Sequence, residues 1–126
     1  MTIRLDHTIV PSKDKNASAR FFAEILGLTV EPGDGYFAQV RVNDTLTFDF
    51  ADEEEAFPGL HYAFHLSDAE FDGVLARVKA RGISFGSAPD APANGRLNRR
   101  RGGRGFYFED PNGHLLEVMT VPESGS

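Results

Sequence analysis

Apolar and polar side chains alternate along much of the chain, and this alternation predicts six β-strands. Four strands cover about residues 3–10, 36–42, 45–50 and 61–66, and two more lie within residues 103–120, joined by the turn Asp110-Pro111-Asn112-Gly113. In two further segments the apolar residues recur every three or four positions, which predicts helices over residues 15–26 and 67–81. The sequence therefore predicts an α+β fold.

The two halves of the chain carry the same order of predicted elements. His7 precedes Gly27, the glycine that ends the first helix, by 20 residues, and His61 precedes Gly82 by 21. Each half continues from its helix into further strands, so the pattern indicates two copies of one βαβββ unit. The acidic segment between them divides a single domain, residues 1–126, into a first module of about 1–55 and a second of about 59–121.

The alternation also separates two chemically different faces of the strands. One face is mostly apolar and is the expected side for the helices: Val40, Val42, Leu46, Phe48, Phe50, Tyr62, Phe64, Leu66, Phe106, Phe108, Leu116 and Val118. The other face mixes Gln39, Arg41, Thr47, Asp49, His61, His65, Tyr107, Glu109 and Glu117 with Ile9, Phe37, Ala63, Leu115 and Met119. The simplest interpretation is that this second face is exposed to solvent. Its mixture of His, Tyr and Glu with apolar residues instead favours a concave pocket.

Composition and charge narrow the chemistry that such a pocket can carry. The chain has 126 residues, enough for one domain with its own core, and no cysteine, so any metal must be bound by His and carboxylates. A formal net charge of −6 argues against nucleic acid as the general partner. No apolar run is long enough to cross a membrane and the N-terminus lacks a signal-peptide pattern, so we expect a cytoplasmic protein.

Glu117 interrupts an otherwise apolar closing strand. A buried carboxylate without a partner costs several kcal/mol, which favours a metal ligand at this position. Two His and one Glu on separate strands, namely His7, His61 and Glu117, suit a divalent ion and leave open positions for water or a chelating substrate. The spacing alone is weak support, and His7 is also compatible with a hydrogen-bonded core histidine. His114 directly follows the turn glycine and is expected in the turn or at the surface.

Three segments carry a resemblance to a known family. These segments resemble the vicinal oxygen chelate superfamily. They are the first-strand segment Leu5-Asp6-His7-Thr8, the strand Leu60-His61-Tyr62-Ala63-Phe64 and the C-terminal segment from Phe106 to Glu117. That superfamily includes glyoxalase I, extradiol dioxygenases, methylmalonyl-CoA epimerase, fosfomycin-resistance thiol transferases and bleomycin-binding proteins. The resemblance covers nearly the whole chain. It implies paired βαβββ modules that form a curved mixed sheet, a half-barrel with helices on its outer face, around one metal ion.

The resemblance places the family's metal ligands on His7, His61 and Glu117, and it implies a divalent ion such as Mn, Ni, Zn or Fe. It does not single out one reaction. The fourth ligand of glyoxalase I falls on Thr47, a poor ligand, with Asp49 two residues further on. The strand around His61 and the position of Tyr107 resemble the fosfomycin-resistance branch.

Three further residues are candidates for catalytic roles beside the ion. The alternation directs the hydroxyl of Tyr107 into the predicted cavity, where it can donate to a bound oxyanion, and Arg104 is the second candidate donor. Asp49 is a candidate proton acceptor, with His65 as the alternative. Arg104 also belongs to a segment with Arg96, Arg99, Arg100 and Arg101, which indicates either a solvated loop or a basic lid that recruits an anionic substrate.

Together these features favour a divalent-metal-dependent enzyme that acts on a small oxygen-chelating substrate, with the ion as a Lewis acid. Lyase or isomerase, transferase and dioxygenase chemistry all stay open. The alternative is a binding protein of the bleomycin-resistance type, which holds a small molecule without catalysis. In the short chains that this sequence resembles, two modules commonly pair across a two-fold axis. We therefore expect a homodimer. Its expected partner is a small molecule, and we expect it to bind neither nucleic acid nor a membrane.

Overall fold

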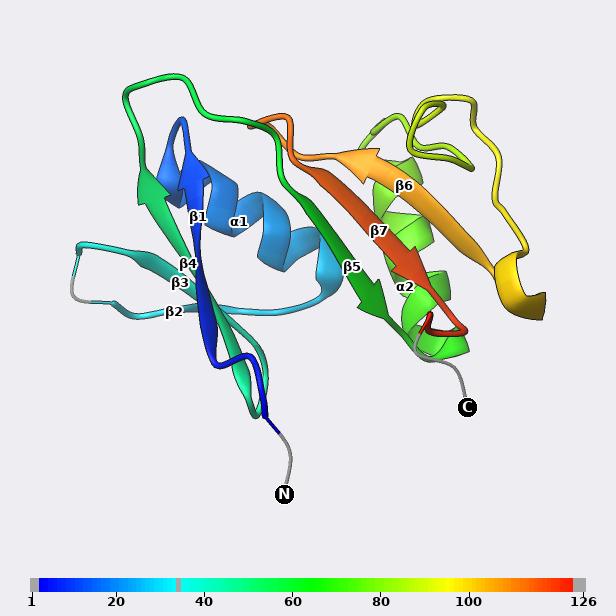
Figure 1. The fold of residues 1–126 in the computed structure, drawn as a ribbon, viewed down its shortest axis with the longest axis horizontal. Coiled ribbons are helices and arrows are strands. Elements are labelled where there is room, and N and C mark those ends of the chain that lie inside the picture. Colours follow the sequence, from blue (N-terminus) through cyan, green and yellow to red (C-terminus); the bar gives the residue numbers. More distant parts are fainter. Residues whose placement is uncertain (1–2, 34, 124–126) are drawn as a thin grey trace. The chain divides into compact units, whose positions relative to one another are not determined.

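The computed structural model describes residues 3–33 and 35–123, which divide into two compact units, one ending at Phe57 and one beginning at Pro58. Unit one contains β1 (His7–Ser12), α1 (Lys15–Leu26), β2 (Val30–Glu31), β3 (Ala38–Asn43) and β4 (Leu46–Asp52). Unit two contains β5 (His61–His65), α2 (Asp68–Ala80), the short 3₁₀ helix η1 (Arg100–Gly102), β6 (Gly105–Glu109) and β7 (Leu115–Met119) (Figure 1). The predicted α+β fold with two βαβββ-like modules is confirmed.

The sheet of unit one has the strand order β1-β4-β3-β2, in which β1 runs parallel to β4 and the other pairs are antiparallel. The first strand begins at His7, later than the predicted 3–10, because it pairs from His7 opposite Thr47 onward. Pro11 is tolerated in β1 because an edge strand needs hydrogen bonds on one side alone. The two-residue strand β2 was not predicted, since two residues are too few to show alternation.

Helix α1 begins and ends where the sequence predicts. The Asp14 side chain accepts hydrogen bonds from the N–H groups of Asn16 and Ala17, which caps the first turn. Gly27 ends the helix in the left-handed region at φ 74°, a conformation that costs glycine little. The helix packs on the sheet through Phe22, whose ring stacks on that of Phe48 at 4.8 Å between centroids.

The sheet of unit two has the order β5-β7-β6, with β5 parallel to β7 and β6 antiparallel to it. Helix α2 opens with a capping box, in which the side chains of Ser67 and Glu70 each accept a hydrogen bond from the other residue's backbone N–H group. It covers one face of the sheet (Figure 1). On this face the ring of Phe71 meets that of Phe106 edge-on, with 5.3 Å between the ring centroids. The apolar face predicted for the second half therefore packs against the helix, which leaves its opposite face for chemistry.

The long segment between α2 and β6 folds back onto β6. Gly86 and Tyr107 exchange backbone hydrogen bonds of 2.9 and 2.8 Å, and Asn98 pairs with Gly105 in the same way. A side chain at Gly86 would lie 1.9 Å from the carbonyl oxygen of Ala91, so only glycine permits this close approach. The predicted loop is thus tied to the sheet at two points. In the described residues, no helix has the length and apolar character of a membrane span.

Candidate metal centre

Three strands of unit two place His61, Tyr107 and Glu117 on the sheet face opposite α2. In the strand register Glu117 stands between Ala63 of β5 and Tyr107 of β6, and His61 is two residues before Ala63. The His61 Nε2 atom lies 3.0 Å from Glu117 Oε1. Two residues 56 positions apart are therefore in contact because β5 and β7, the first and last strands of this unit, are direct neighbours.

The carboxylate of Glu117 is buried, and polar groups surround it. Glu117 is 8% exposed, and besides His61 it receives a hydrogen bond from the Tyr107 hydroxyl. The Arg100 guanidinium lies close by, with its Nη1 atom 4.0 Å from Glu117 Oε2. The buried carboxylate predicted from the sequence is therefore real, and it is paired as its desolvation requires.

Tyr107 is almost fully buried, at 1% exposure, and its hydroxyl takes part in two hydrogen bonds. It accepts one from Arg100 Nη1 and donates the other to Glu117. Burial raises the pKa of Tyr107, and the neighbouring Glu117 carboxylate raises it further, whereas Arg100 acts in the opposite direction. The hydroxyl therefore stays protonated near neutral pH and serves as a donor.

These side chains line a hollow of about 460 Å³ on the sheet face. Its floor is formed by β5, β6 and β7, and its rim by the segment that contains η1 and by the residues after β7. The lining residues are His61, Ala63, His65, Pro89, Arg100, Arg101, Tyr107, Glu117, Met119, Pro122 and Glu123. The mixture of apolar and ionisable side chains is typical of a small-molecule site.

The spacing of His61 and Glu117 suits a shared metal ion. Nitrogen and oxygen ligands lie about 2.0–2.2 Å from a transition-metal ion, so two ligands at a right angle are about 3.0 Å apart. The observed separation of 3.0 Å matches this value. In the described part of the chain these two residues form a pair, and no group of three His, Asp or Glu side chains converges there.

His7, the third predicted ligand, lies in unit one at the start of β1. Its Nδ1 atom lies 2.8 Å from the Asp6 carboxylate, which can only accept, so Nδ1 carries the proton. This hydrogen bond raises the pKa of His7. Metal-bound histidines usually donate their second ring nitrogen to a carboxylate in this way, which leaves Nε2 as the coordinating atom. The donor chemistry of His7 therefore fits a ligand.

Asp49 also lies in unit one, on β4, and is buried at 5% exposure. Its carboxylate accepts a hydrogen bond of 2.9 Å from the Gln39 amide on the neighbouring strand β3. It lies near enough to His7 to contribute to the raised pKa of that histidine. Asp49 and His7 thus belong to one electrostatic environment, whereas Thr47 stands directly opposite His7 in the strand register.

The structure places Arg104 away from the hollow. Its guanidinium bonds Asp72 at 2.8 Å and Asp68 at 3.0 Å, and it lies 4.5 Å from the centre of the Phe71 ring. All three partners belong to α2, so Arg104 ties the helix to the sheet. Arg100 is the arginine that reaches Tyr107, and sequence reasoning did not separate it from the other arginines of this segment.

His114 is fully buried, in contrast to the turn or surface position that we expected. Its Nδ1 atom accepts a hydrogen bond of 2.9 Å from the backbone N–H of Leu60, directly before β5. The alternation could have predicted this burial, because His114 is in phase with the buried residues Leu116 and Val118. His114 therefore helps to hold β5, and with it His61, against β7.

His65, the alternative proton acceptor, lies on the rim of the hollow. Its Nε2 atom is 3.1 Å from the carbonyl oxygen of Thr120, which is an acceptor. This bond leaves Nδ1 as the ring atom that can accept a proton. His65 lies on the same sheet face as His61, but its hydrogen bond is with Thr120 rather than with Glu117.

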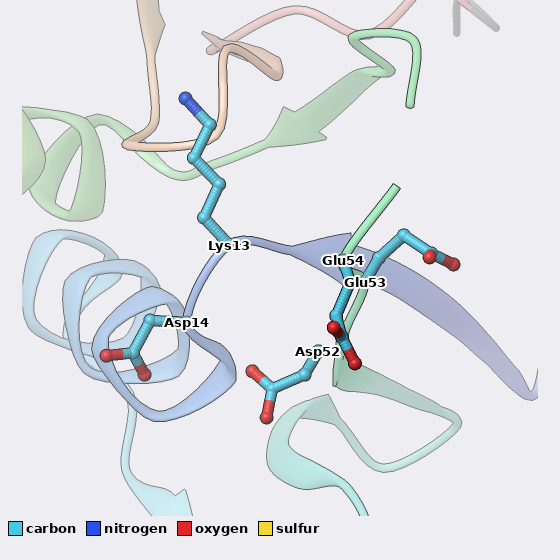
Figure 2. A pocket seen from close by; sticks show the side chains of 5 residues that line it. All are labelled: Lys13, Asp14, Asp52, Glu53 and Glu54. Atoms are coloured by element: carbon cyan, nitrogen blue, oxygen red, sulfur yellow. The ribbon is translucent and has the colours of Figure 1, made fainter. Parts of the chain in front are cut away.

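Unit one has a separate acidic hollow, lined by Lys13, Asp14, Asp52, Glu53 and Glu54 (Figure 2). Two of its carboxylates have structural roles. Asp14 caps α1, and Asp52 accepts a hydrogen bond of 2.8 Å from the backbone N–H of Lys15. These contacts account for Asp14 and Asp52 without a ligand, and we assign no site here.

A sequence profile of the glyoxalase/bleomycin resistance protein/dioxygenase superfamily matches residues 4–118. The chain belongs to this superfamily. The family predicted from the segments around His7, His61 and Glu117 is thereby confirmed.

Two solved structures of the superfamily are similar to this chain over nearly its whole length. Oxidase ChaP-H2 is 44% identical, with a TM-score of 0.94, and the match covers 99% of this chain and 98% of that one. Oxidase ChaP-H1 is 41% identical, with a TM-score of 0.92, and the match covers 98% of this chain and 100% of that one.

A more distant relative is the glutathione transferase FosA of Serratia marcescens. It is 27% identical over 120 residues, which cover 90% of this chain and 78% of the relative. These three relatives carry the names of two oxidases and one transferase.

Proposed function

We propose that this chain is a divalent-metal-dependent oxidase that acts on a small substrate with two neighbouring oxygen atoms and uses dioxygen as the oxidant. The observation that carries the proposal is the pair of His61 Nε2 and Glu117 Oε1, 3.0 Å apart on the floor of the hollow. The similarity to two oxidases at 44% and 41% identity favours oxidation over the other reactions of the superfamily.

The ligands of the proposed site are His7, His61 and Glu117. Two histidines and one carboxylate are the set that non-haem iron(II) oxygenases use, so iron is the first candidate, ahead of Mn, Ni and Zn. When bound, such an ion supplies Lewis acidity toward the substrate oxygens and leaves positions open for them.

The side chains around the ligands have complementary roles in this proposal. The Tyr107 hydroxyl, which donates to Glu117 in the structure, turns in this proposal to donate its hydrogen bond to a substrate oxygen as negative charge develops there. Burial raises its pKa and keeps it protonated. Asp49 accepts a proton from the substrate, held in place by the Gln39 amide. The apolar residues Ala63 and Met119 limit the access of water to the floor of the hollow.

The test is metal binding by a histidine variant and a matched control. Protein purified without added metal is first analysed for its metal content and then titrated with Mn²⁺ by calorimetry. His61→Ala should lose stoichiometric binding, by about 10²-fold or more in affinity. His65→Ala removes a histidine four residues further along the same strand and in the same hollow, and it should keep the wild-type affinity.

Oxygen consumption with catechol-like and hydroxy-acid substrates, measured on the iron-loaded protein, tests the reaction. Equal Mn²⁺ affinity in His61→Ala and the wild type would remove His61 from the site. If the protein bound such small molecules but bound no divalent ion and consumed no oxygen, it would instead be a binding protein of the bleomycin-resistance type.

A further inference from the structure

Arg100 occupies an unusual position in the hollow of unit two. Its Nη1 atom donates a hydrogen bond to the Tyr107 hydroxyl, and its guanidinium carbon lies 5.3 Å from the centre of the Tyr107 ring. The same Nη1 atom is 4.0 Å from Glu117 Oε2. The Arg100 side chain is nevertheless 46% exposed, so its contacts with the floor of the hollow are made from the solvent side.

The charges around Glu117 balance differently with and without a divalent ion. Without the ion, the guanidinium offsets the buried carboxylate. With an ion bound to Glu117, two further positive charges face the same carboxylate, and Arg100 and the ion repel each other across a few ångströms. Arg101, the other arginine of the rim, is 3.8 Å from Glu123 and is already paired. The excess positive charge of the loaded hollow is therefore concentrated on Arg100 and the ion.

We propose, resting on the function proposed above, that Arg100 is the counter-ion of Glu117 in the ion-free protein and binds an anionic group of the substrate once the ion is in place. A planar guanidinium matches a carboxylate or phenolate oxygen pair. Because the side chain is half-exposed and its contacts in the hollow are to one tyrosine and one carboxylate, it can rotate without any rearrangement of the sheet. The substrate class is thus an organic anion whose charged group lies beside an oxygen atom that can bind the ion.

The experiment compares Arg100→Met with Arg99→Met. Both variants remove one arginine from the same segment, but Arg99 does not line the hollow. In buffer free of carboxylate and phosphate, we expect Arg100→Met to bind Mn²⁺ roughly tenfold more tightly than the wild type, because the repelling charge is gone. Arg99→Met should match the wild type.

Salicylate, which carries a carboxylate beside a phenolic oxygen, serves as the anionic probe in a second titration of Mn²⁺-loaded protein. We expect Arg100→Met to weaken salicylate binding roughly tenfold and Arg99→Met to leave it unchanged. Arg100→Lys keeps the charge but loses the planar fork, so it should retain the wild-type Mn²⁺ affinity and recover part of the salicylate affinity.

The two proposals fail in different ways. Wild-type protein that binds no Mn²⁺ would overturn the metal-dependent function, and the role of Arg100 would fall with it. Wild-type protein that binds Mn²⁺, together with equal Mn²⁺ and salicylate affinities in Arg100→Met and Arg99→Met, would overturn the role of Arg100 alone.

Discussion

At the scale of single residues, each unit places a carboxylate next to one of the proposed histidine ligands. Asp6 bonds Nδ1 of His7, and Glu117 lies 3.0 Å from Nε2 of His61. The two pairs differ in burial, because Glu117 is 8% exposed whereas Asp6 is at the surface. We therefore expect Asp6 to influence metal binding through the pKa of His7, whereas Glu117 is itself a candidate ligand.

The first prediction concerns the pH dependence of metal binding in Asp6→Asn. The hydrogen bond that His7 donates to Asp6 raises the pKa of His7, so the protonated ring persists to higher pH, and a doubly protonated ring cannot bind an ion. Removing the Asp6 charge should lower this pKa and shift the midpoint of Mn²⁺ binding to lower pH. At higher pH the variant should bind more weakly than the wild type, since the ring is no longer oriented.

Calorimetric Mn²⁺ titrations at a series of pH values measure this midpoint. Asp44→Asn, which removes an exposed carboxylate from the same unit, is the control for net charge. If both variants kept the wild-type midpoint, Asp6 would have no part in the acidity of the site.

At the scale of elements, the sequence predicted those parts of the fold that a regular spacing of apolar residues or a helix cap marks locally. Helix α1 has the predicted bounds because Asp14 and Gly27 mark its two ends, and α2 lies within the predicted residues 67–81 because Ser67 caps its first turn. The start of the first strand was wrong because pairing with β4, a contact between distant residues, decides where β1 begins.

The candidate site was predictable to the same extent. Alternation placed His61, Tyr107 and Glu117 on one face, because these residues lie on regular paired strands. Alternation could not distinguish Arg100 from Arg104, since the two lie around an irregular turn where period-two spacing does not apply. The direction of each arginine depends on its long-range partners, Tyr107 for one and the α2 carboxylates for the other.

The second prediction concerns the capping box of α2. Ser67→Ala removes the hydroxyl that accepts the Glu70 N–H, and it should lower the free energy of unfolding by about 1 kcal/mol at neutral pH. The backbone N–H of Ser67 and its side chain lower the pKa of Glu70 in the folded chain. The contribution of ionised Glu70 is therefore present above its unfolded pKa, about 4.3, and is lost as the pH falls through the lower folded value.

Urea unfolding at neutral pH and in acid measures both effects. The difference between the wild type and Ser67→Ala should shrink in acid, because the Ser67 hydroxyl helps to lower the pKa of Glu70 and this part of its contribution is lost once Glu70 is protonated. Ser84→Ala, at an exposed serine outside the helices, should change stability little at either pH. A capping contribution that stays constant through the acid range would contradict the reciprocal role of Glu70.

At the scale of the whole molecule, the proposed ligand set draws on both units. His7 belongs to unit one, whereas His61 and Glu117 belong to unit two. One site thus needs one unit of each kind, supplied by a single chain or by two chains. The homodimer expected from the family resemblance would supply them from two.

The third prediction is complementation between inactive variants. If sites are shared across a dimer, mixing His7→Ala with Glu117→Ala should restore one intact site in each heterodimer, measured as recovered Mn²⁺ binding. Mixing His61→Ala with Glu117→Ala should restore none, because both changes then fall in the same unit. Heterodimers that form without recovery would rule out sharing, and a monomer in sedimentation velocity would rule out the dimer.

The neighbouring positions of β5 and β7 have a consequence for the order of events during folding. The His61–Glu117 contact closes a loop of 56 residues, and the two strands run parallel, so α2 and the segment after it must be in place between them. Contacts between distant residues form late, since the chain entropy lost in closing the loop comes before any gain from pairing. On the ribosome, β7 emerges after the other described strands. The nascent chain therefore cannot acquire a metal ion through this pair before β7 itself has been synthesised.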